Sequence, residues 1–479
     1  MTVTFIIPPS GFLLDARVFP SLGVLKVAAV LEAQGLAVDV LDLSGVSDVS
    51  GAVRAHVTAS PSDVYGLTAT SPQMPASAAI ADQLHALVPG VRVILGGPHV
   101  TLMQASARQE LKRDEPSRAC QAMADLAKRF DVLVCGDGEH AIQSALLPDA
   151  AGIIDGDDPK SGMFLTSDEL GELPLAARHL IDLSSYHYTV DGVRAHSLIG
   201  QLGCPMGCAF CGGRRSPFLR KIRMRSTEAV ISEMRSIYET YGTRGFMFLD
   251  DELNVNRQFM DLLAAMVRLQ DDVGVEFRMR GFLKAELITD PMAQAMYAAG
   301  FRQVLVGFES GSERILANIQ KRANQADNTR AIDTLHAHGL AVKALMSLGH
   351  PGESDETIED TRSWLLATRP DEFDATIITV YPGTPYYDDA REVTPGIWTY
   401  ADPKNGDRLH AYPVDHLQDE SFYKGIPGQY RSFVFTDALS AEDLCVRRDA
   451  LEEEVRTALA IPYPVASPEI NYEHSMGQR

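Results

Sequence analysis

Short apolar runs alternate with helical segments along most of this chain, and this alternation constrains the fold more than any other feature. The first series lies within residues 1–145 and includes the runs VTFIIPP, VRVILGG and DVLVCGDGE. Apolar strands that are separated by helices form parallel sheets covered on both faces. We therefore expect residues 1–145 to form a Rossmann-like, doubly wound α/β domain.

The alternation returns in residues 191–390. Six strand-like runs separated by helical patterns predict a partial (β/α)6 barrel of the TIM type, in which chemistry takes place at the carboxyl ends of the strands. Residues 146–190 are rich in turn formers and predict a connector. The pattern weakens in residues 391–479, where we expect a small, mostly helical region that shapes or caps a substrate pocket, followed by an extended Pro-rich tail.

Composition narrows the possible partners and the location. The chain has 479 residues and a formal net charge of −21, so a polyanion such as nucleic acid is not expected as a partner. No run approaches the ~20 apolar residues that span a bilayer, and the N-terminus lacks the features of a signal peptide. We expect a cytoplasmic protein with reduced cysteines and no membrane contact.

Glycines cluster where the strands of the first series end, at Gly66, Gly96, Gly97, Gly136 and Gly138. Doubly wound folds bind ligands at this edge of the sheet. The same glycines also suit tight turns between strands and helices. Both interpretations, a ligand site and simple turns, stay open from the sequence.

Three cysteines follow the first strand of the second series, at Cys204, Cys208 and Cys211, with the spacing C-x₃-C-x₂-C. A structural zinc site needs four ligands, and no second pair lies nearby. A [4Fe–4S] cluster normally takes four thiolates, so three leave one iron open to another ligand. The other three cysteines are isolated in sequence and are expected to be dispensable for a cluster, namely Cys120, Cys135 and Cys445.

This motif and its surroundings resemble the radical S-adenosylmethionine enzymes. The later segments FLDDE (248–252), GFESGSERIL (307–316) and LGHPGESDET (348–357) are similar to that superfamily's barrel signatures. Upstream, YGLTATSPQMPAS, VILGGPHVT and VLVCGDGEHAI resemble the domain that precedes the barrel in the cobalamin-dependent members, some relatives of which bind no cobalamin. The resemblance covers about residues 1–390.

The resemblance implies three cofactors: a [4Fe–4S] cluster, S-adenosylmethionine and cobalamin. It places the cluster on the three cysteines, and cobalamin in residues 1–145 without a histidine below cobalt, because D-x-H-x-x-G is absent. The expected S-adenosylmethionine contacts are Phe210, Arg225, Asp250, Asp251 and Glu309. The expected cobalamin contacts are Ser71, Met74, Gly96, Gly97, His99, Gly136 and Gly138.

Several of these residues have a second interpretation that is purely structural. Arg225 could pair with a carboxylate, His99 could be a packing residue, and Ser71 to Met74 could simply begin a helix. One of the two acids Asp250 and Asp251 could cap the next helix.

The basic run at residues 214–225 has three interpretations: a solvated face, a site for an anionic substrate or cofactor group, and a docking site for an acidic electron donor. The family implies an external donor of the flavodoxin or ferredoxin type.

The expected function is that of a cobalamin-dependent methyltransferase acting on an unactivated carbon of a small molecule, as in secondary metabolism. It would use a 5′-deoxyadenosyl radical and methylcobalamin. Two alternatives stay open: a cyclase or rearrangement enzyme of the same build without net methyl transfer, and an iron–sulfur or corrinoid carrier.

Overall fold

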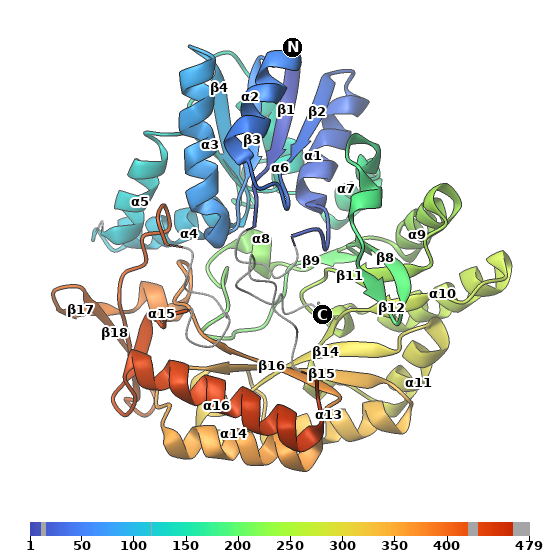
Figure 1. The fold of residues 1–479 in the computed structure, drawn as a ribbon, viewed down its shortest axis with the longest axis vertical. Helices are drawn as coiled ribbons and strands as arrows, with labels where there is room; N and C mark the ends of the chain where they lie inside the picture. Colours follow the sequence, from blue (N-terminus) through green and yellow to red (C-terminus); the bar gives the residue numbers. More distant parts are fainter. Residues whose placement is uncertain (11–15, 116, 420–429, 463–479) are drawn as a thin grey trace.

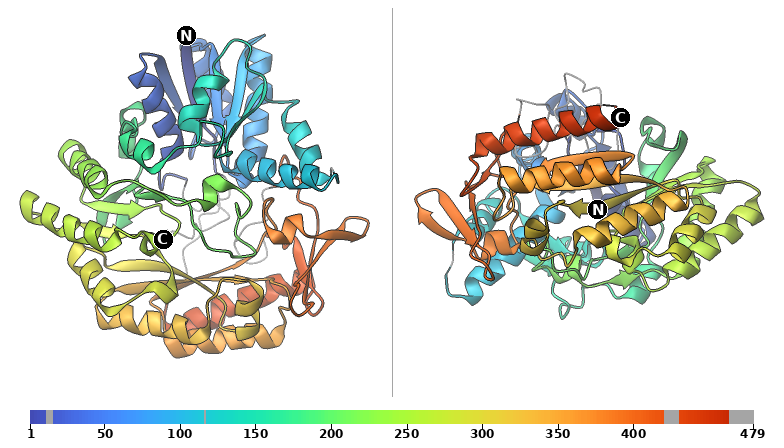
Figure 2. Two further views of the ribbon diagram at one scale, coloured as in Figure 1. Left: turned by 180° about the vertical axis from the view of Figure 1, so that it is seen from behind. Right: turned by 90° about the horizontal axis from the view of Figure 1, so that it is seen from below.

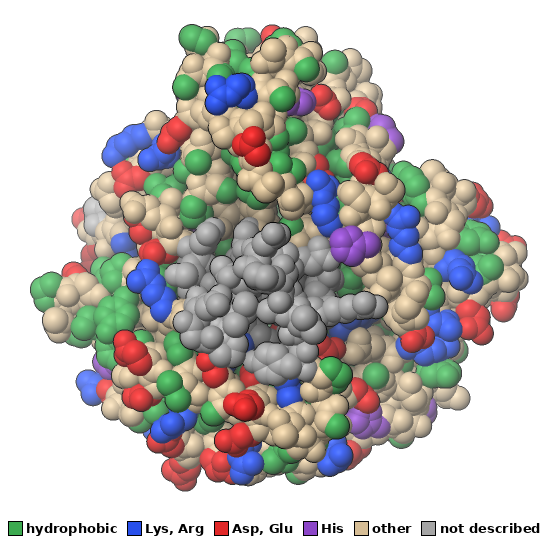
Figure 3. All heavy atoms as spheres, viewed as in Figure 1, with side chains coloured by type: hydrophobic (Ala, Val, Ile, Leu, Met, Phe, Trp, Pro, Cys, Tyr) green, Lys and Arg blue, Asp and Glu red, His purple; other side chains and the backbone are tan. Residues whose placement is uncertain are grey.

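The computed structural model describes residues 1–10, 16–115, 117–419 and 430–462. An N-terminal sheet with its helices lies above a curved sheet with its own helices, and a C-terminal region lies along one side of the second sheet (Figure 1). Acidic and basic side chains are interspersed over the face shown in Figure 3. Among the described residues, no helix is long and apolar enough to cross a membrane.

The N-terminal sheet has six parallel strands in the order β2-β1-β3-β4-β5-β6. Helices cover both of its faces and bury a separate apolar cluster on each, which confirms the doubly wound fold. The strands are β1 (Thr2–Ile7), β2 (Ala37–Asp42), β3 (Val64–Thr68), β4 (Arg92–Gly96), β5 (Val132–Gly136) and β6 (Gly152–Gly156). One face carries α1 (Leu22–Ala33) and α6 (Gly138–Ala145), and the other carries α2 (Val49–Ala59), α3 (Met74–Leu87), α4 (Pro98–Lys112) and α5 (Arg118–Leu126).

The sheet continues beyond residue 145, where the sequence analysis ended the first domain. β6 pairs in parallel with β5, although residues 146–190 were expected to be only a connector. The run GIIDG is short, and its first two residues are exposed, so it lacks the apolar pattern of a buried strand. The rest of the segment contains only α7 (Ser167–Glu172), short 3₁₀ turns and β7 (Thr189–Val190).

Six further parallel strands form a half-barrel, as predicted, and they are hydrogen-bonded as two sheets that meet at the divided third strand. They are β8 (Val193–Leu198), β11 (Gly245–Phe248), a third strand divided into β12 (Arg278–Arg280) and β13 (Phe282–Leu283), β14 (Gln303–Glu309), β15 (Ala341–Leu348) and β16 (Glu372–Ile377). Gly281 separates the two parts of the third strand, and a Cβ there would lie 2.4 Å from Leu253 Cδ1. A larger side chain at the break would therefore have to displace the Leu253 side chain.

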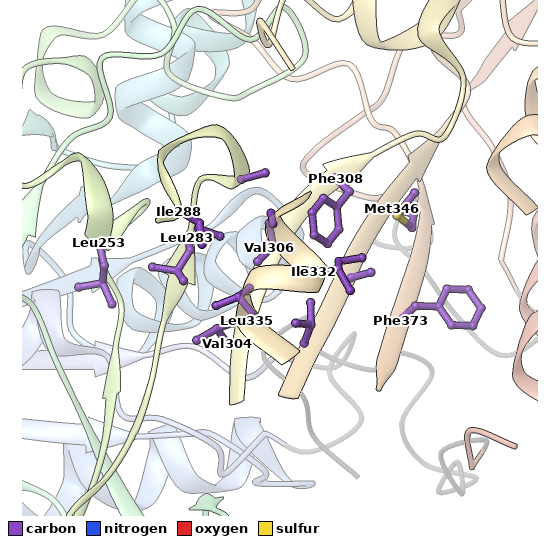
Figure 4. Packing of buried hydrophobic residues seen from close by; sticks show 14 of the residues in the cluster. Leu253, Leu283, Ile288, Val304, Val306, Phe308, Ile332, Leu335, Met346 and Phe373 are labelled. Atoms are coloured by element: carbon purple, nitrogen blue, oxygen red, sulfur yellow. The ribbon is translucent and has the colours of Figure 1, made fainter. Parts of the chain in front are cut away.

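Helices cover the outer face of the half-barrel (Figure 2). They are α9 (Thr227–Tyr241), α10 (Phe259–Val273), α11 (Asp290–Ala299), α12 (Glu313–Asn318), α13 (Gln325–Ala337) and α14 (Asp355–Thr368). Val304, Val306 and Phe308 of β14 pack with Ile332 and Leu335 of α13 in the main apolar core (Figure 4). This packing fixes the strands whose ends carry the candidate site.

The C-terminal region contains the expected helix, α16 (Ala441–Leu459), which packs on β16 and α14. It also contains an antiparallel sheet that the sequence analysis did not anticipate, formed by β17 (Arg391–Thr394), β18 (Ile397–Ala401), β19 (Arg408–Ala411) and β20 (Val434–Thr436). These strands are only three to five residues long and β17 is exposed throughout, so they give a weak pattern. The predicted extended tail lies in residues 463–479, outside the described residues.

Candidate active site

The three cysteines lie on a loop after the short strand β9 (Gln201–Leu202), which pairs with β10 (Arg223–Met224). The loop begins at Gly203, whose φ of +82° favours glycine and whose Cβ would lie 2.4 Å from the Lys221 carbonyl oxygen. The Cys204 N–H donates to the Leu219 carbonyl oxygen at 2.9 Å, and the Ala209 N–H donates to that of Ile319 at 2.8 Å. The loop is thus fixed at both ends by backbone contacts.

The basic run 214–225 supports this loop. Arg220, at the end of α8 (Pro217–Arg220), donates to the carbonyl oxygens of Met206 and, at 2.9 Å, Pro205. Arg214 donates to the Gly207 carbonyl oxygen. These guanidinium groups satisfy carbonyl groups of a loop that has no regular secondary structure. The sequence analysis did not foresee this structural role of the basic run.

Two further members of the run form buried contacts. Arg223 pairs with Asp137, which lies between β5 and α6, and both side chains are at most 1% exposed. Arg225 pairs with Glu233 at 2.5 Å and donates to the Ile199 carbonyl oxygen at 2.9 Å. Glu233 also pairs with Arg178 at 2.9 Å. The structure therefore gives Arg225 the carboxylate partner that the sequence left open, and its guanidinium is engaged there rather than in the site.

Burial raises the pKa of all three thiols, that of Cys204 to about 11. Cys211 is the most exposed of them, but protein surrounds its thiol closely enough for the same effect. Among the described residues, no three His, Cys, Asp or Glu side chains converge on a single metal-ion position. A [4Fe–4S] cube would take the three thiolates on three different irons. Metal binding to such thiols releases protons.

Asp250 follows β11 and fastens it to the end of β8. Its two carboxylate oxygens accept hydrogen bonds from the backbone N–H groups of Gly200 at 2.9 Å and Gln201 at 2.6 Å. Burial raises its pKa to about 7, against the effect of these two bonds. Asp250 is therefore a positioning residue for the segment that leads to the cysteines.

The next two acids are less engaged. Asp251 has an exposed side chain, but the surrounding protein still desolvates its carboxyl group and raises its pKa to about 6. Glu252 was not singled out from the sequence, although FLDDE contains it. Its Oε2 atom is buried without a hydrogen-bond partner, and burial raises its pKa to about 7. Such an atom fits a site where a ligand supplies the missing donor.

Glu309, at the end of β14, joins a hydrogen-bonded chain of four side chains. Its Oε1 lies 2.7 Å from Lys321 Nζ, its Oε2 accepts from Ser347 Oγ at 2.8 Å, and Ser347 Oγ lies 2.8 Å from His350 Nε2. Burial opposes ionisation, but the Lys321 charge and the hydrogen bonds outweigh it and lower the pKa of Glu309. Burial lowers the pKa of His350 to about 4.

The sequence analysis missed Lys321, Ser347 and His350. His350 lies inside the quoted segment LGHPGESDET, so a signal for it was available, whereas Lys321 follows α12 in a loop without any motif. The ring of Phe210, a predicted contact, lies 5.2 Å from the His350 ring and packs against the main core.

A cavity of about 330 Å³ lies at the carboxyl edge of the N-terminal sheet. Gly96, Gly97, Gly136 and Gly138 all line it. Gly97 has a φ of +102° and Gly136 a φ of +74°, and a Cβ at either would lie under 3 Å from neighbouring atoms. Gly97 and Gly136 thus make the expected tight turns, and the cavity beside them leaves room for a ligand, whose binding there stays a prediction.

Residues of the half-barrel form part of the wall of this cavity. Ile199, Leu202 and Phe218, which flank the cysteine loop in sequence, line it together with residues of the N-terminal sheet. No histidine is among its described lining residues, and the charged ones are Lys26 and Glu139, which pair with each other at 3.1 Å. A mostly apolar cavity edged by glycine fits a large ligand that needs close backbone approach.

The structure places the other three predicted cobalamin contacts elsewhere. Met74 is fully buried in an apolar core, and Ser71 Oγ lies 2.9 Å from Nδ1 of the buried His99. None of them lines the cavity, whereas Thr70 and Gln73 do. The reason is the 3₁₀ turn Ser71–Gln73, which directs Ser71 and Met74 into the domain. The structural interpretations of the helix start and of His99 therefore describe this structure, and a cobalamin contact at these three residues stays a prediction.

Family models match two parts of the chain: the B12 binding domain at residues 16–114 and the radical SAM superfamily at residues 198–365. An uncharacterized methyltransferase of Pyrococcus horikoshii is 26% identical over 409 residues, which cover 80% of this chain and 82% of the relative. An anaerobic magnesium-protoporphyrin IX monomethyl ester cyclase of Cereibacter sphaeroides is 24% identical over a match that covers 69% of this chain and 53% of the cyclase.

Among solved structures, the radical S-adenosylmethionine methyltransferase TsrM from Kitasatospora setae, with cobalamin and a [4Fe–4S] cluster bound, superposes with a TM-score of 0.65. It is 16% identical, and the match covers 94% of this chain and 90% of that one, so it shows the shared fold. Fold and site together define an enzyme with a Rossmann-like, doubly wound domain packed on a half-barrel. The chain belongs to the radical S-adenosylmethionine enzymes that carry a B12-binding domain.

Proposed function

We propose that this enzyme methylates an unactivated carbon of a small biosynthetic substrate and consumes two S-adenosylmethionines per product. One observation carries the proposal: residues beside the cysteine loop, Leu202 and Phe218, line the same cavity as Gly97 and Gly136 of the B12-binding domain. A corrinoid bound in that cavity would thus lie next to the cluster loop. Methyl transfer between two such cofactors and one substrate requires this proximity.

The residues present fit the family's three cofactors. Cys204, Cys208 and Cys211 would hold the cluster, and the glycine-edged cavity would hold part of cobalamin. The hydrogen-bonded side chains that run from Lys321 through Glu309 and Ser347 to His350 would bind the amino, ribose and adenine groups of S-adenosylmethionine, together with Asp251 and Glu252. When bound, the cluster and S-adenosylmethionine supply a carbon radical that removes hydrogen, and cobalamin supplies the methyl group.

The protein's own groups bind, orient and shield. Glu309 is held ionised by Lys321 and offers a carboxylate at the strand end, where hydroxyl and ammonium groups are suitable donors. Asp250 holds the segment that leads to the cysteine loop, and the arginines of the basic run hold the loop itself by donating hydrogen bonds to its carbonyl oxygens. The N-terminal domain and the half-barrel line the cavity together, and this mostly apolar lining would limit water around a reactive carbon centre.

The test uses S-adenosylmethionine labelled in its methyl group, with anaerobically reconstituted enzyme and candidate substrates suggested by neighbouring genes. Methyl transfer predicts the label in the product, together with S-adenosylhomocysteine.

Cyclisation without net methyl transfer is the second candidate, and the likeness to the magnesium-protoporphyrin cyclase favours it. In that case the same experiment yields 5′-deoxyadenosine and an unlabelled product. The presence of S-adenosylhomocysteine in the first case and its absence in the second separates the two candidates.

A further inference from the structure

A second open pocket, of about 330 Å³, lies on the outer side of the cysteine loop. Gly207, Leu316 and Gln320 contribute to its walls, and three cations line it: Arg214, Arg322 and Lys404. No acidic residue lines it among the residues that the structure describes. It is separate from the cavity of the B12-binding domain, since the two share no lining residue.

The three cations have no carboxylate partner in the described part of the chain. Arg214 donates to the Gly207 carbonyl oxygen and to Gln320 Oε1 at 3.1 Å, and burial together with the nearby Arg220 and Arg215 lowers its pKa. Arg322 and Lys404 are exposed.

The acids nearest to Lys404 in sequence are engaged elsewhere. Asp407 pairs with Arg314 at 2.6 Å, and the buried Asp402 accepts the backbone N–H of Lys404. The pocket therefore carries uncompensated positive charge in a chain whose net charge is −21.

The pocket directly adjoins the cluster loop. Gly207 precedes Cys208 in sequence, and the Arg214 guanidinium would lie 3.6 Å from a Cβ at Gly207. A group bound in the pocket is therefore separated from the backbone of a cluster cysteine by one residue. A donor protein held at this solvent-open pocket would therefore lie against the cysteine loop.

We propose that this pocket, formed by Arg214, Arg322 and Lys404 beside Gly207, docks an acidic side chain of a one-electron donor protein of the flavin or iron–sulfur class. The proposal rests on the proposed function, which needs a reduced cluster. One electron leaves the donor's reduced group and one enters the [4Fe–4S] cluster, and no bond forms or breaks. A chain with a charge of −21 repels an acidic protein on average, so a local basic pocket would orient the donor toward the loop.

The test compares wild type with the double variant Arg322→Glu and Lys404→Glu, which leaves Arg214 and its contact to the loop intact. The control is Arg54→Glu, an exposed charge reversal on α2 in the other domain. Binding of an acidic flavodoxin to the reconstituted full-length protein is measured by titration at several salt concentrations. Formation of 5′-deoxyadenosine is measured with that flavodoxin and, separately, with reduced methyl viologen, a small cation that needs no basic pocket.

We expect the double variant to bind flavodoxin about tenfold more weakly and with a smaller salt dependence. Its activity with methyl viologen and its cluster absorbance should equal those of wild type, as should all properties of Arg54→Glu. Equal flavodoxin affinity of the double variant and wild type would overturn the proposal, and binding of inorganic phosphate in the pocket would not rescue it. An equal loss of 5′-deoxyadenosine formation with flavodoxin and with methyl viologen would also overturn it. If wild type forms no 5′-deoxyadenosine with methyl viologen, the proposed function fails, and the titration still tests docking.

Discussion

Glu309 has a backbone conformation that is rare for a residue with a side chain, with a φ of +69° next to a β-bulge in β14. Such a conformation costs about 1–3 kcal/mol and persists where the surroundings fix it. Here Lys321 and Ser347 hold both carboxylate oxygens. The strained backbone thus presents an ionised carboxylate at the carboxyl end of a barrel strand, beside the cluster loop.

Replacing Glu309 with Gln should raise the KM for S-adenosylmethionine about tenfold or more, because the neutral amide lacks the negative charge that the proposed site offers to hydroxyl or ammonium groups of the cofactor. The change also leaves the buried Lys321 ammonium without its carboxylate. Steady-state kinetics of 5′-deoxyadenosine formation measures this change. Glu228→Gln, an exposed acid in the first turn of α9, is the matched control. An unchanged KM in Glu309→Gln would remove Glu309 from the site.

Each single change of Cys204, Cys208 or Cys211 to Ala should abolish the cluster absorbance and 5′-deoxyadenosine formation, because a cube with two protein thiolates is not retained. Cys445→Ala is the control, since Cys445 lies on α16, outside the loop. Cleavage of S-adenosylmethionine at the wild-type rate in any of the three variants would contradict the assignment.

At the scale of single elements, the strands and helices of both sheets follow from apolar runs and helical spacing, so their order could be predicted. The short strands could not, because β6 and β17 are too short and exposed to leave a pattern. The glycines at the carboxyl edge of the N-terminal sheet were predictable, because they lie where apolar runs end in the sequence. The burial of Ser71 and Met74 was not, because a 3₁₀ turn of three residues decides it. Lys321 meets Glu309 through tertiary packing, which the sequence does not reveal.

Gly138 offers a test of the glycine-edged cavity. It begins α6, lines the cavity and has no positive φ. A Cβ there would lie 3.1 Å from Val27 Cγ2, which also lines the cavity, so Gly138→Leu crowds this wall without backbone strain. Overpacking of this kind costs about 1–3 kcal/mol, so we expect cobalamin affinity to fall about tenfold or more. Gly171→Leu on α7, where a Cβ meets open space, should leave it unchanged. Equal cobalamin affinity of Gly138→Leu and wild type, measured by titration, would place the corrinoid elsewhere.

At the scale of the whole molecule, buried contacts connect the B12-binding domain to the segment behind the cluster loop. Asp137 pairs with Arg223, whose guanidinium also lies over the rings of Phe164 and Phe218. Asp157 accepts from Ser216 Oγ at 2.6 Å. Both acids follow strands of the N-terminal sheet, so the two halves are fixed relative to one another at the cavity.

Arg223→Met should destabilise the protein by about 3–5 kcal/mol, because it leaves the buried Asp137 without its cation. A lower Tm in thermal unfolding measures the loss. Adding Asp137→Asn should recover part of it, since the neutral amide needs no counter-charge. If the double variant is no more stable than Arg223→Met, the ion pair is not the cause.

The central claim is that the two halves act in one methylation cycle, and the most direct test counts both coproducts of S-adenosylmethionine during turnover of the reconstituted enzyme with its substrate. The account predicts equal amounts of 5′-deoxyadenosine and S-adenosylhomocysteine, each matching the methylated product. Product formed with 5′-deoxyadenosine alone, and no S-adenosylhomocysteine, would contradict it.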